Sequence, residues 1–481
     1  MSGTWQTNKT FADEVEVRTL LVRQDEQIGA LSVADLALMW PSASAQLRES
    51  TAAALGIPSE NVGLFVTQNH VNPGAPHYHG VVDMARLERA FVQAAKEAAA
   101  ALQPAEVAHV NARPDPPLTF RRRVPMGDMG EFTCYYGFLV DEKGRANCSP
   151  VIRAALAGLA GGQAFPINAV EFDNEGRPEQ PEAAMPVPDP LHLPRAADEL
   201  VQGLFFRSPG GKPIGCLIRF ASHPNTYGAA GDSQHSGDYP AYVRRRAEQA
   251  FGGMGVFLTG PCGDQVCPIR RKSLQLAESI GRQVADAVLG RLAGASWQRD
   301  AVVRAASPEV RLRVREDYPE SRVAARKEWD EIKAAFPEAA RAGASLAELK
   351  RMSDRYEFLL WVANTGDSHR DWTGLEVTGR AGQEVSHPLF LLQIGPSVIA
   401  GLPGEPFGGY SARLRAETIG EALITAEEAN GYLSYFPMAE DYPRGGYEVT
   451  AALFGPDSEE ALVGAAGRAV LKSVGKTGAN D

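Results

Sequence analysis

Residues 62–70 read VGLFVTQNH, a short apolar run of the kind that forms a buried strand, followed by a polar loop. Three later stretches repeat this pattern, and they are IGCLIRFASHP (214–224), MGVFLTGPCGDQ (254–265) and SVIAGLPGEPF (397–407). In an open α/β sheet, residues that follow the carboxyl ends of strands gather at one edge even when they are far apart in sequence. We therefore expect the polar groups of these loops to converge, and they are His70, His223, Asp264 with Cys262 and Cys267, and Glu405.

Strand-like and helix-like segments alternate along the rest of the chain. Residues 84–102 are rich in Ala, Leu, Glu and Lys, which is typical of a helix, whereas 17–23 has the pattern of a strand. This alternation predicts an α/β fold, in which mixed sheets are flanked by helices and the site lies at the carboxyl ends of strands. The highly charged stretch at about 317–356 is expected to be a helical insertion within a single domain that covers residues 1–481.

The composition favours a soluble globular protein over a fibrous or disordered one. Apolar residues make up 44% of the 481 residues and charged residues 22%. The net charge of −11 argues against a nucleic-acid partner, because such proteins need a basic surface. The one dense basic run, Arg121 to Arg123, is short, and it fits either a solvated strand edge or a contact with an anionic group.

The first residues lack the basic-then-apolar pattern of a signal peptide, and no apolar run approaches the length that spans a bilayer. The five cysteines are an odd number, which favours free thiols over a disulfide framework. We therefore expect a cytoplasmic protein with no stable membrane association. The sequence leaves open whether it forms a homo-oligomer.

Several common catalytic signatures are absent from the sequence, and their absence narrows the choice of function. There is no HExxH, GxSxG, Walker A or GxGxxG pattern, which disfavours zincins, α/β-hydrolases, P-loop enzymes and Rossmann dehydrogenases. The expected cluster of histidines, carboxylates and thiols instead matches the ligands that zinc prefers. A metal site at the converging loops is the prediction that remains.

Seven separated blocks of the chain resemble, in order, the neutral/alkaline ceramidase family in its shorter branch, which lacks the C-terminal immunoglobulin-like domain. They are ALSVADL (30–36), GIPSENVGLFVTQNHVNPG (56–74), FRRRVPMGD (120–128), GKPIGCLIRFASHP (211–224), SGDYPAYVRRRAEQAFG with MGVFLTGPCGDQ (236–265), LPGEPF (402–407) and NGYLSYFPMAEDYPRGGYE (430–448). The resemblance implies a ceramidase-like catalytic domain that uses Zn²⁺. In that family two histidines, a glutamate and a tyrosine hold the metal, and a metal-bound water attacks an amide carbonyl.

The resemblance assigns roles to five residues of this chain. The ASHP block implies that His223 is a metal ligand, and PGEPF implies the same for Glu405. The last block implies that Tyr435 is a ligand and that Tyr447 faces the reacting carbonyl. Arg122 takes the place of an arginine that meets the substrate.

The first histidine ligand is the point at which the chain departs from the family. The family has Thr-His-Thr-His after this strand, and its first histidine binds the metal. Without gaps, Gln68 takes that position and His70 takes the place of the second histidine. Either the loop is shifted so that His70 is the ligand, which is the assignment we make, or the ligand set differs from the family. His77 and His79 could also supply a replacement.

A second departure concerns the loop 263–268, GDQVCP, which is one residue longer than the family's Gly-Asp-x-Ser-Pro loop. Cys267 stands before the proline, where the family has a serine. A thiolate beside zinc could bind the metal or attack the substrate, and a small side chain that fills a tight loop explains the cysteine equally well.

Together, these assignments predict a zinc-dependent hydrolase that cleaves a C–N amide bond of a small soluble substrate. Arg122 and Tyr447 would stabilise the oxyanion, and Asp264 or His70 would handle the proton. Ester or lactone hydrolysis is the alternative within this class. If Gln68 means that zinc is lost, the chain is a metal-free binding protein or a thiol enzyme that uses Cys267.

Overall fold

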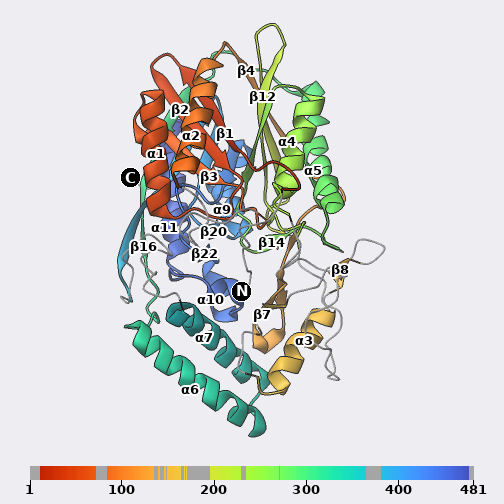
Figure 1. Ribbon diagram of the computed structural model, residues 1–481, viewed down its shortest axis with the longest axis vertical. Helices are drawn as coiled ribbons and strands as arrows, with labels where there is room; N and C mark the ends of the chain where they lie inside the picture. Colours follow the sequence, from red (N-terminus) through yellow and green to blue (C-terminus); the bar gives the residue numbers. More distant parts are fainter. Residues whose placement is uncertain are drawn as a thin grey trace.

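The computed structural model describes residues 11–71, 84–134, 139–140, 146–147, 149–163, 167, 169–170, 196–228, 234–269, 271–364 and 381–475. Its helices are α1 (Pro41–Leu55), α2 (Met84–Ala100), α3 (Ser149–Ala160), α4 (Asp238–Ala250), α5 (Leu274–Leu289), α6 (Arg322–Arg341), α7 (Leu346–Asn364), α9 (Gly408–Glu417), α10 (Tyr447–Thr450) and α11 (Ser458–Ser473). Figure 1 shows these elements along the long axis of the molecule. Within the described part of the chain, no helix has the length and apolar character needed to span a membrane.

Three larger sheets form the main body of the protein. The first contains β1 (Val17–Gln24), β2 (Gln27–Ala34) and β3 (Val62–Val66). The second has the order β13 (Met254–Thr259), β12 (Pro213–Phe220), β11 (Val201–Arg207) and β4 (Glu106–Ala112). The third has the order β15 (Val303–Ala306), β18 (Phe390–Ile394), β19 (Ser397–Gly401) and β21 (Leu423–Ala426).

Each of these sheets combines one parallel pair with one or two antiparallel pairs. The parallel pairs are β2 with β3, β12 with β13, and β19 with β21. Short strands complete the fold, and they are β5 (Phe120–Arg121), β6 (Arg123–Pro125), β7 (Glu131–Cys134), β8 (Leu139–Val140), β9 (Ala146–Asn147), β10 (Ala169–Val170), β14 (Gln265–Val266), β16 (Glu309–Arg313), β17 (Glu384–Pro388), β20 (Glu405–Pro406) and β22 (Tyr435–Phe436). The prediction of an α/β fold with mixed sheets is confirmed.

One apolar cluster contains side chains from all three sheets, among them Leu31, Leu217 and Leu392, which explains why these strands read as nearly continuous apolar runs. All five residues of β3 are buried, as expected for a strand covered on both faces. Phe65 on β3 packs edge-on against Phe390 on β18, with 6.0 Å between the ring centroids. A Cβ atom at Gly63 would lie 2.3 Å from the Phe390 ring, so this contact between sheets requires glycine there.

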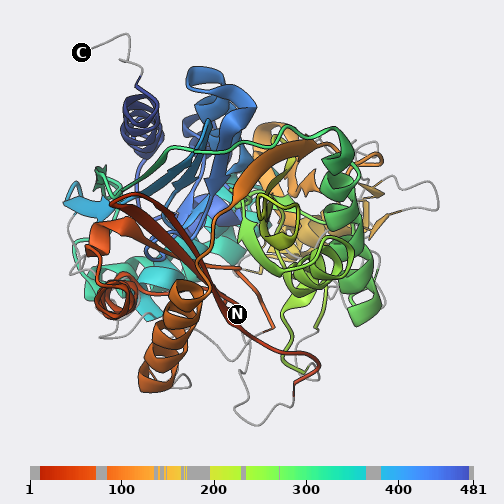
Figure 2. The same ribbon diagram turned by 90° about the horizontal axis from the view of Figure 1, so that it is seen from above.

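Helix pairs cover the outer faces of the sheets (Figure 2). α1 and α2 lie against the sheet of β1 to β3, where Leu47 and Phe91 are fully buried. α4 and α5 cover the sheet that contains β11 to β13, and they bury Tyr239 and Val284. These helices therefore obtain their stability from an apolar face packed on a sheet.

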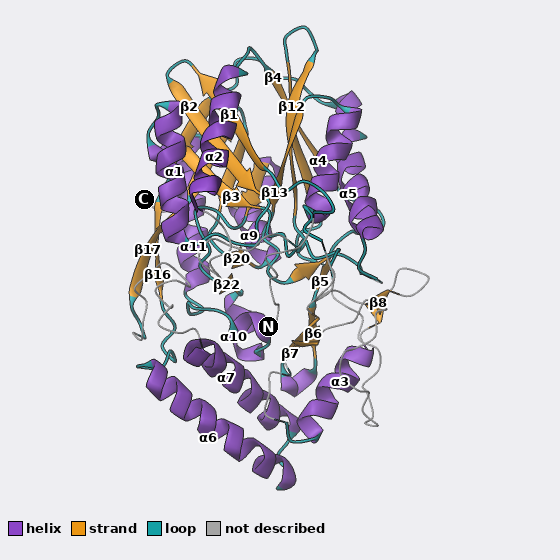
Figure 3. Ribbon diagram, viewed as in Figure 1, coloured by secondary structure: helices purple, strands orange, loops and turns teal. Residues whose placement is uncertain are grey.

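The stretch expected to be a helical insertion contains α6 and most of α7, and α7 continues to Asn364. The two helices form an antiparallel hairpin at the end of the molecule opposite to the tips of β1 and β12 (Figure 3). Ser321 caps the start of α6, since its hydroxyl accepts a hydrogen bond from the Ala324 amide. Trp329 and Leu359 anchor the hairpin in an apolar cluster that also contains Tyr435 and Tyr447.

The carboxyl ends of strands from all three sheets meet above this hairpin. The Thr259 hydroxyl at the end of β13 donates a hydrogen bond to the Thr67 carbonyl just after β3. The Glu427 amide, just after β21, donates to the Thr259 carbonyl at 2.9 Å. These links place the loops that follow β3, β13 and β21 side by side.

Candidate functional site

Gln68, His223 and Glu405 converge in the region where these loops meet. His223 Nε2 lies 3.1 Å from Glu405 Oε2 and 3.3 Å from Gln68 Nε2. The Gln68 amide also donates a hydrogen bond to Glu405 Oε2. All three residues are buried, so their contacts are shielded from water and determine the polarity of the site.

Two backbone carbonyls fix the orientation of the His223 ring. Its Nδ1 lies 2.8 Å from the Cys262 carbonyl and 3.1 Å from the Gln265 carbonyl. Both are acceptors, so Nδ1 carries the hydrogen and the Nε2 lone pair faces Glu405. Burial, followed by the charge of Arg122, holds the pKa of His223 well below its usual value, which keeps this lone pair available.

Two tyrosines lie beside the Glu405 carboxylate. Glu405 on β20 and Tyr435 on β22 are directly paired in a parallel bridge. The side chains of Tyr435 and Tyr432 both hydrogen-bond to Glu405. Burial raises the pKa of Glu405, and the neighbouring Tyr435 and Arg122 oppose this shift.

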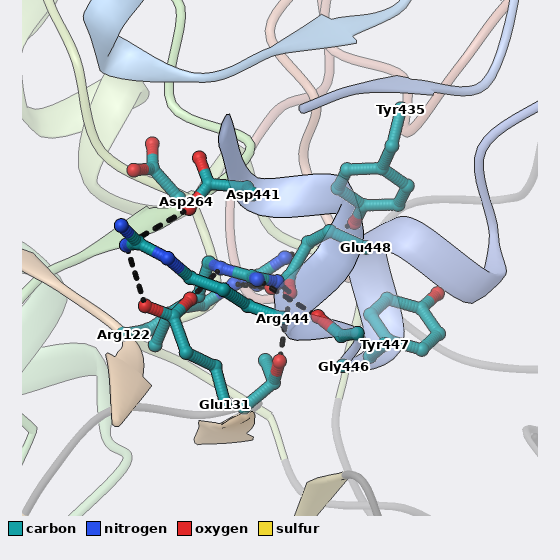
Figure 4. A network of polar contacts seen from close by, with 12 residues as sticks. Arg122, Glu131, Asp264, Tyr435, Asp441, Arg444, Gly446, Tyr447 and Glu448 are labelled. Carbon is teal, nitrogen blue, oxygen red and sulfur yellow. Dashed lines mark hydrogen bonds and ion pairs between the residues drawn. The ribbon is translucent and has the colours of Figure 1, made fainter. Parts of the chain in front are cut away.

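Arg122 is fully buried and connects this group to an ion-pair network (Figure 4). Its Nη2 donates to the Tyr435 hydroxyl at 3.2 Å, and its Nε donates to Glu448 Oε1 at 2.8 Å. Arg123 binds the second Glu448 oxygen at 2.8 Å and Glu131 at 2.6 Å. Arg122 and Arg123 are thus held by carboxylates of the protein itself, and neither belongs to a solvated strand edge.

Tyr447 is the first residue of α10 and precedes Glu448. Its ring packs edge-on against Tyr435, with 5.5 Å between the centroids, and both rings are drawn in Figure 4. The ring centroid of Trp361 on α7 lies 6.4 Å from that of Tyr447. The structure therefore brings Arg122, Tyr435 and Tyr447 together.

His70 lies beside this group, and its ring centroid is 5.7 Å from that of His223. Its amide donates to the Pro224 carbonyl at 3.2 Å. The residue itself is exposed to solvent. His77 and His79 lie outside the described residues.

Asp264 follows β13 as expected, but its carboxylate is engaged by other groups. Oδ1 accepts the Gly408 amide at 2.8 Å, at the start of α9, and Oδ2 accepts Arg121 Nε at 3.3 Å. A carboxylate at a helix N-terminus is a stabilising arrangement. Asp264 thus fixes α9 and Arg121, and neither oxygen is directed to His223 or Glu405 by these bonds.

The two cysteines of this loop differ in their surroundings. Cys267 is fully buried in an apolar cluster with Val266, and its sulfur lies 3.1 Å from the Ser222 hydroxyl. Burial raises the pKa of Cys267 to about 12, which keeps the thiol protonated. The thiol nearer the site is that of Cys262, which lies 3.6 Å from His223 Nδ1 and 3.4 Å from Gln68 Oε1.

Sequence reasoning did not single out Glu427 and Glu428, which directly follow β21. They could have been found, because LITAEE (423–428) has the same pattern of a strand followed by polar groups. Both carboxyl oxygens of Glu428 are buried, and neither has a hydrogen-bond partner among the described residues. Burial, and then the charge of Glu405, raises the pKa values of Glu427 and Glu428 well above the ordinary value.

Left-handed backbone geometry is concentrated in the loops around Glu405. Positive φ angles occur at four of their non-glycine residues, which are Gln68 (59°), Glu428 (55°), Asn430 (58°) and Ser434 (75°). Such conformations cost free energy, and they persist where the surrounding structure enforces them, commonly at functional sites. The observation supports this region as the functional site.

The distance between His223 Nε2 and Glu405 Oε2 fits two ligands of one metal ion. The Nε2 lone pair of His223 and Glu405 Oε2 are both acceptors 3.1 Å apart, and a cation, a proton or the Gln68 amide hydrogens can bridge them. Two ligands of a tetrahedral zinc ion, each at about 2.0 Å, lie roughly 3.3 Å apart. Among the described residues, no cluster of three or more His, Cys, Asp or Glu could hold a metal, and the further oxygen donors beside His223 and Glu405 are those of Tyr435 and Gln68.

No protein-family model matches the chain, and no curated protein matches it either. Among solved structures, neutral ceramidase from Pseudomonas aeruginosa matches with a TM-score of 0.61 at 14% identity, over 99% of this chain and 72% of that protein. A ceramidase complexed with C2 matches with a TM-score of 0.59 at 14% identity, over 99% and 73% of the two chains. The chain therefore has the fold of the neutral ceramidases.

Proposed function

We propose that this protein is a metal-dependent hydrolase that cleaves the C–N amide bond of a small soluble substrate. The observation that carries the proposal is the pair of acceptors, His223 Nε2 and Glu405 Oε2, which lie 3.1 Å apart beside Tyr435 in a ceramidase fold. His223, Glu405 and Tyr435 would hold the ion. Zinc, when bound, would lower the pKa of a water molecule and polarise the scissile carbonyl.

Arg122 and Tyr447 are the groups that we assign to the negative charge that develops on the carbonyl oxygen. The Arg122 guanidinium is already fixed by Glu448 and by the Tyr435 hydroxyl, so it needs no reorganisation during the reaction. Preorganised donors in a buried site stabilise a developing charge far better than mobile donors in water. Tyr447, whose ring packs on Tyr435, is the second donor that we assign to this charge.

His70 is the better candidate for proton transfer, because both oxygens of Asp264 are engaged by Gly408 and Arg121. His70 is exposed and stands next to His223, where an imidazole can take a proton from water and give it to the leaving nitrogen. Ester or lactone hydrolysis would use the same groups. The thiol-enzyme alternative has less support, since Cys267 is buried and protonated.

The test is a set of chromogenic N-acyl amides, esters and lactones, together with metal analysis of the purified protein. We expect near-stoichiometric zinc and amide cleavage, both of which are lost in Glu405→Ala and after chelation. Glu421→Ala, which removes an exposed glutamate, is the matched control. It should change neither the zinc content nor the rate of amide cleavage. A wild-type protein that hydrolyses amides at an undiminished rate after complete metal removal would overturn the proposal.

A further inference from the structure

Gln68 stands at the position where the family that the sequence resembles has its first metal-binding histidine. We infer that the Gln68 amide, and not the His70 imidazole, binds the ion, so that one imidazole nitrogen and three oxygens hold it. The oxygens come from Glu405, Tyr435 and Gln68. This inference rests on the proposed function, because it concerns the same metal site.

The contacts of the Gln68 side chain place it among the other ligands. Its terminal nitrogen lies 3.3 Å from His223 Nε2 and is hydrogen-bonded to Glu405 Oε2. One terminal atom of Gln68 thus touches both of the atoms that would face the ion. The His70 ring is instead placed by its ring contact with His223, at a centroid distance of 5.7 Å.

Backbone hydrogen bonds oppose the loop shift that would bring His70 into this place. The Thr67 amide donates to the Ala34 carbonyl at 2.9 Å, and the Asn69 amide donates to the Leu36 carbonyl at 3.0 Å. The His70 amide is bound to Pro224. A shift of two residues would break all three bonds, and a buried amide that finds no new partner is destabilising.

The amide of Gln68 can present either of its terminal atoms to the ion. Rotation by 180° about the last side-chain bond exchanges the positions of its oxygen and nitrogen. The oxygen would then face His223 and Glu405, and the nitrogen would face the Cys262 sulfur, which now lies 3.4 Å from the oxygen. A thiol is both a weak donor and a weak acceptor, and the Cys262 thiol can donate to Glu427 at 3.0 Å, so it suits either orientation.

A carbonyl oxygen in place of an imidazole changes which metal ions the site prefers. Imidazole suits zinc, copper and nickel, whereas carboxylate and carbonyl oxygens suit harder ions such as manganese. The wild-type site should therefore bind zinc more weakly, and discriminate less against manganese, than a site with a histidine at position 68. This consequence can be measured without any substrate.

The experiment measures binding of Zn²⁺ and Mn²⁺ to the metal-free full-length protein, by competition with a chromogenic chelator. We compare wild type with Gln68→His, Gln68→Leu and His70→Gln. We expect Q68H to bind zinc at least about tenfold more tightly and to raise the zinc-over-manganese ratio, and Q68L to bind zinc at least about tenfold more weakly. H70Q should match wild type, and Co²⁺ spectra should change in Q68H but not in H70Q.

The outcomes separate this inference from the proposed function. Loss of zinc in H70Q with unchanged binding in Q68L would overturn the inference and leave the metal-dependent hydrolase intact. A wild type that binds no ion, beside a Q68H variant that binds zinc, would overturn both. Thermal melting of each metal-free variant identifies any variant that fails to fold, and Q68H and H70Q decide the question if Q68L is unfolded.

Discussion

Glu427 holds Cys262 through both of its carboxyl oxygens, since Oε2 accepts the Cys262 amide at 2.9 Å and Oε1 accepts the thiol at 3.0 Å. The carbonyl of the same cysteine accepts the Nδ1 hydrogen of His223. Glu427 therefore positions a metal-ligand candidate through one intervening residue. Partners of this kind fix the orientation of a ligating histidine and affect metal affinity strongly.

We expect Glu427→Ala to weaken zinc binding about 10–100-fold, because the Cys262 loop loses both of its anchors. The unpaired amide should also lower the free energy of unfolding by about 1–3 kcal/mol. In Glu427→Gln, the side-chain amide can accept from the Cys262 amide and donate to the Cys262 sulfur. This variant should retain most of the zinc affinity and most of the stability. Zinc titration and urea unfolding of the metal-free proteins check this, and equal zinc affinity in E427A and wild type would contradict it.

One face of α7 contacts the turn that carries Tyr447. Asp354 accepts the Gly446 amide at 3.3 Å, Glu357 accepts the Thr450 hydroxyl at 2.8 Å, and Trp361 lies against the Tyr447 ring. The spacing of Asp354, Glu357 and Trp361 follows the helical repeat, so one surface stripe makes all three contacts.

Loss of the contact between Trp361 and Tyr447 should affect turnover more than metal binding. We expect Trp361→Ala to lower kcat about tenfold or more with zinc content unchanged, because Tyr447 loses its fixed position. Trp361→Phe should restore most of the rate. Lys327→Ala, on the exposed face of α6, is the control variant. A rate unchanged in W361A would show that the hairpin does not position Tyr447.

Removal of the Arg122 guanidinium should harm both activity and stability. Arg122→Ala leaves Glu448 with one of its two buried arginine partners and takes a donor from Tyr435. We expect kcat to fall about 100-fold and the free energy of unfolding to fall by about 3–5 kcal/mol. Arg122→Lys should recover stability more than rate. Arg113→Ala, at an exposed ion pair, is the control, and urea unfolding with steady-state kinetics supplies both numbers.

The sequence predicted which loops would meet, but not where each side chain would point. His223 and Glu405 follow strands whose carboxyl ends converge, and that pattern is local and readable. Asp264 shares the pattern, yet its direction depends on the Gly408 amide of a distant helix. The sequence left open whether Gln68 or His70 fills the first ligand position, because the contact of Gln68 with Glu405 depends on a left-handed backbone angle that no local signal for glutamine indicates.

The buried position of Cys267 leads to a prediction about its reactivity. Only the thiolate reacts readily with alkylating agents, and a pKa of about 12 leaves almost none at pH 8. We expect iodoacetamide to leave Cys267 unmodified in the folded protein at pH 8 and to modify it after unfolding, as peptide mass analysis would show. Cys267→Ala should keep full metal content and hydrolysis. Rapid alkylation that abolishes activity, or an inactive C267A, would favour the thiol-enzyme alternative.

The buried carboxyl of Glu428, which has no hydrogen-bond partner within the described part of the chain, predicts how stability should depend on pH. Burial, followed by Glu405 and Glu427, holds its pKa well above the ordinary value of 4.5. The folded protein thus binds this proton more tightly than the unfolded chain. The contribution of Glu428 to the free energy of unfolding is therefore fully present below the pKa of the unfolded chain, about 4.3, and is lost as the pH rises through the pKa of the folded protein.

Glu428→Gln removes this titration and keeps the shape of the side chain. We expect the variant to gain stability over wild type as the pH rises from 5 towards the folded-state pKa, at up to about 1.4 kcal/mol per pH unit. Urea unfolding of the metal-free proteins at several pH values measures the gain, with the exposed Glu421→Gln as the matched control. Parallel curves for E428Q and wild type would mean that the Glu428 carboxyl is already ionised in the folded protein and has a partner that offsets its charge.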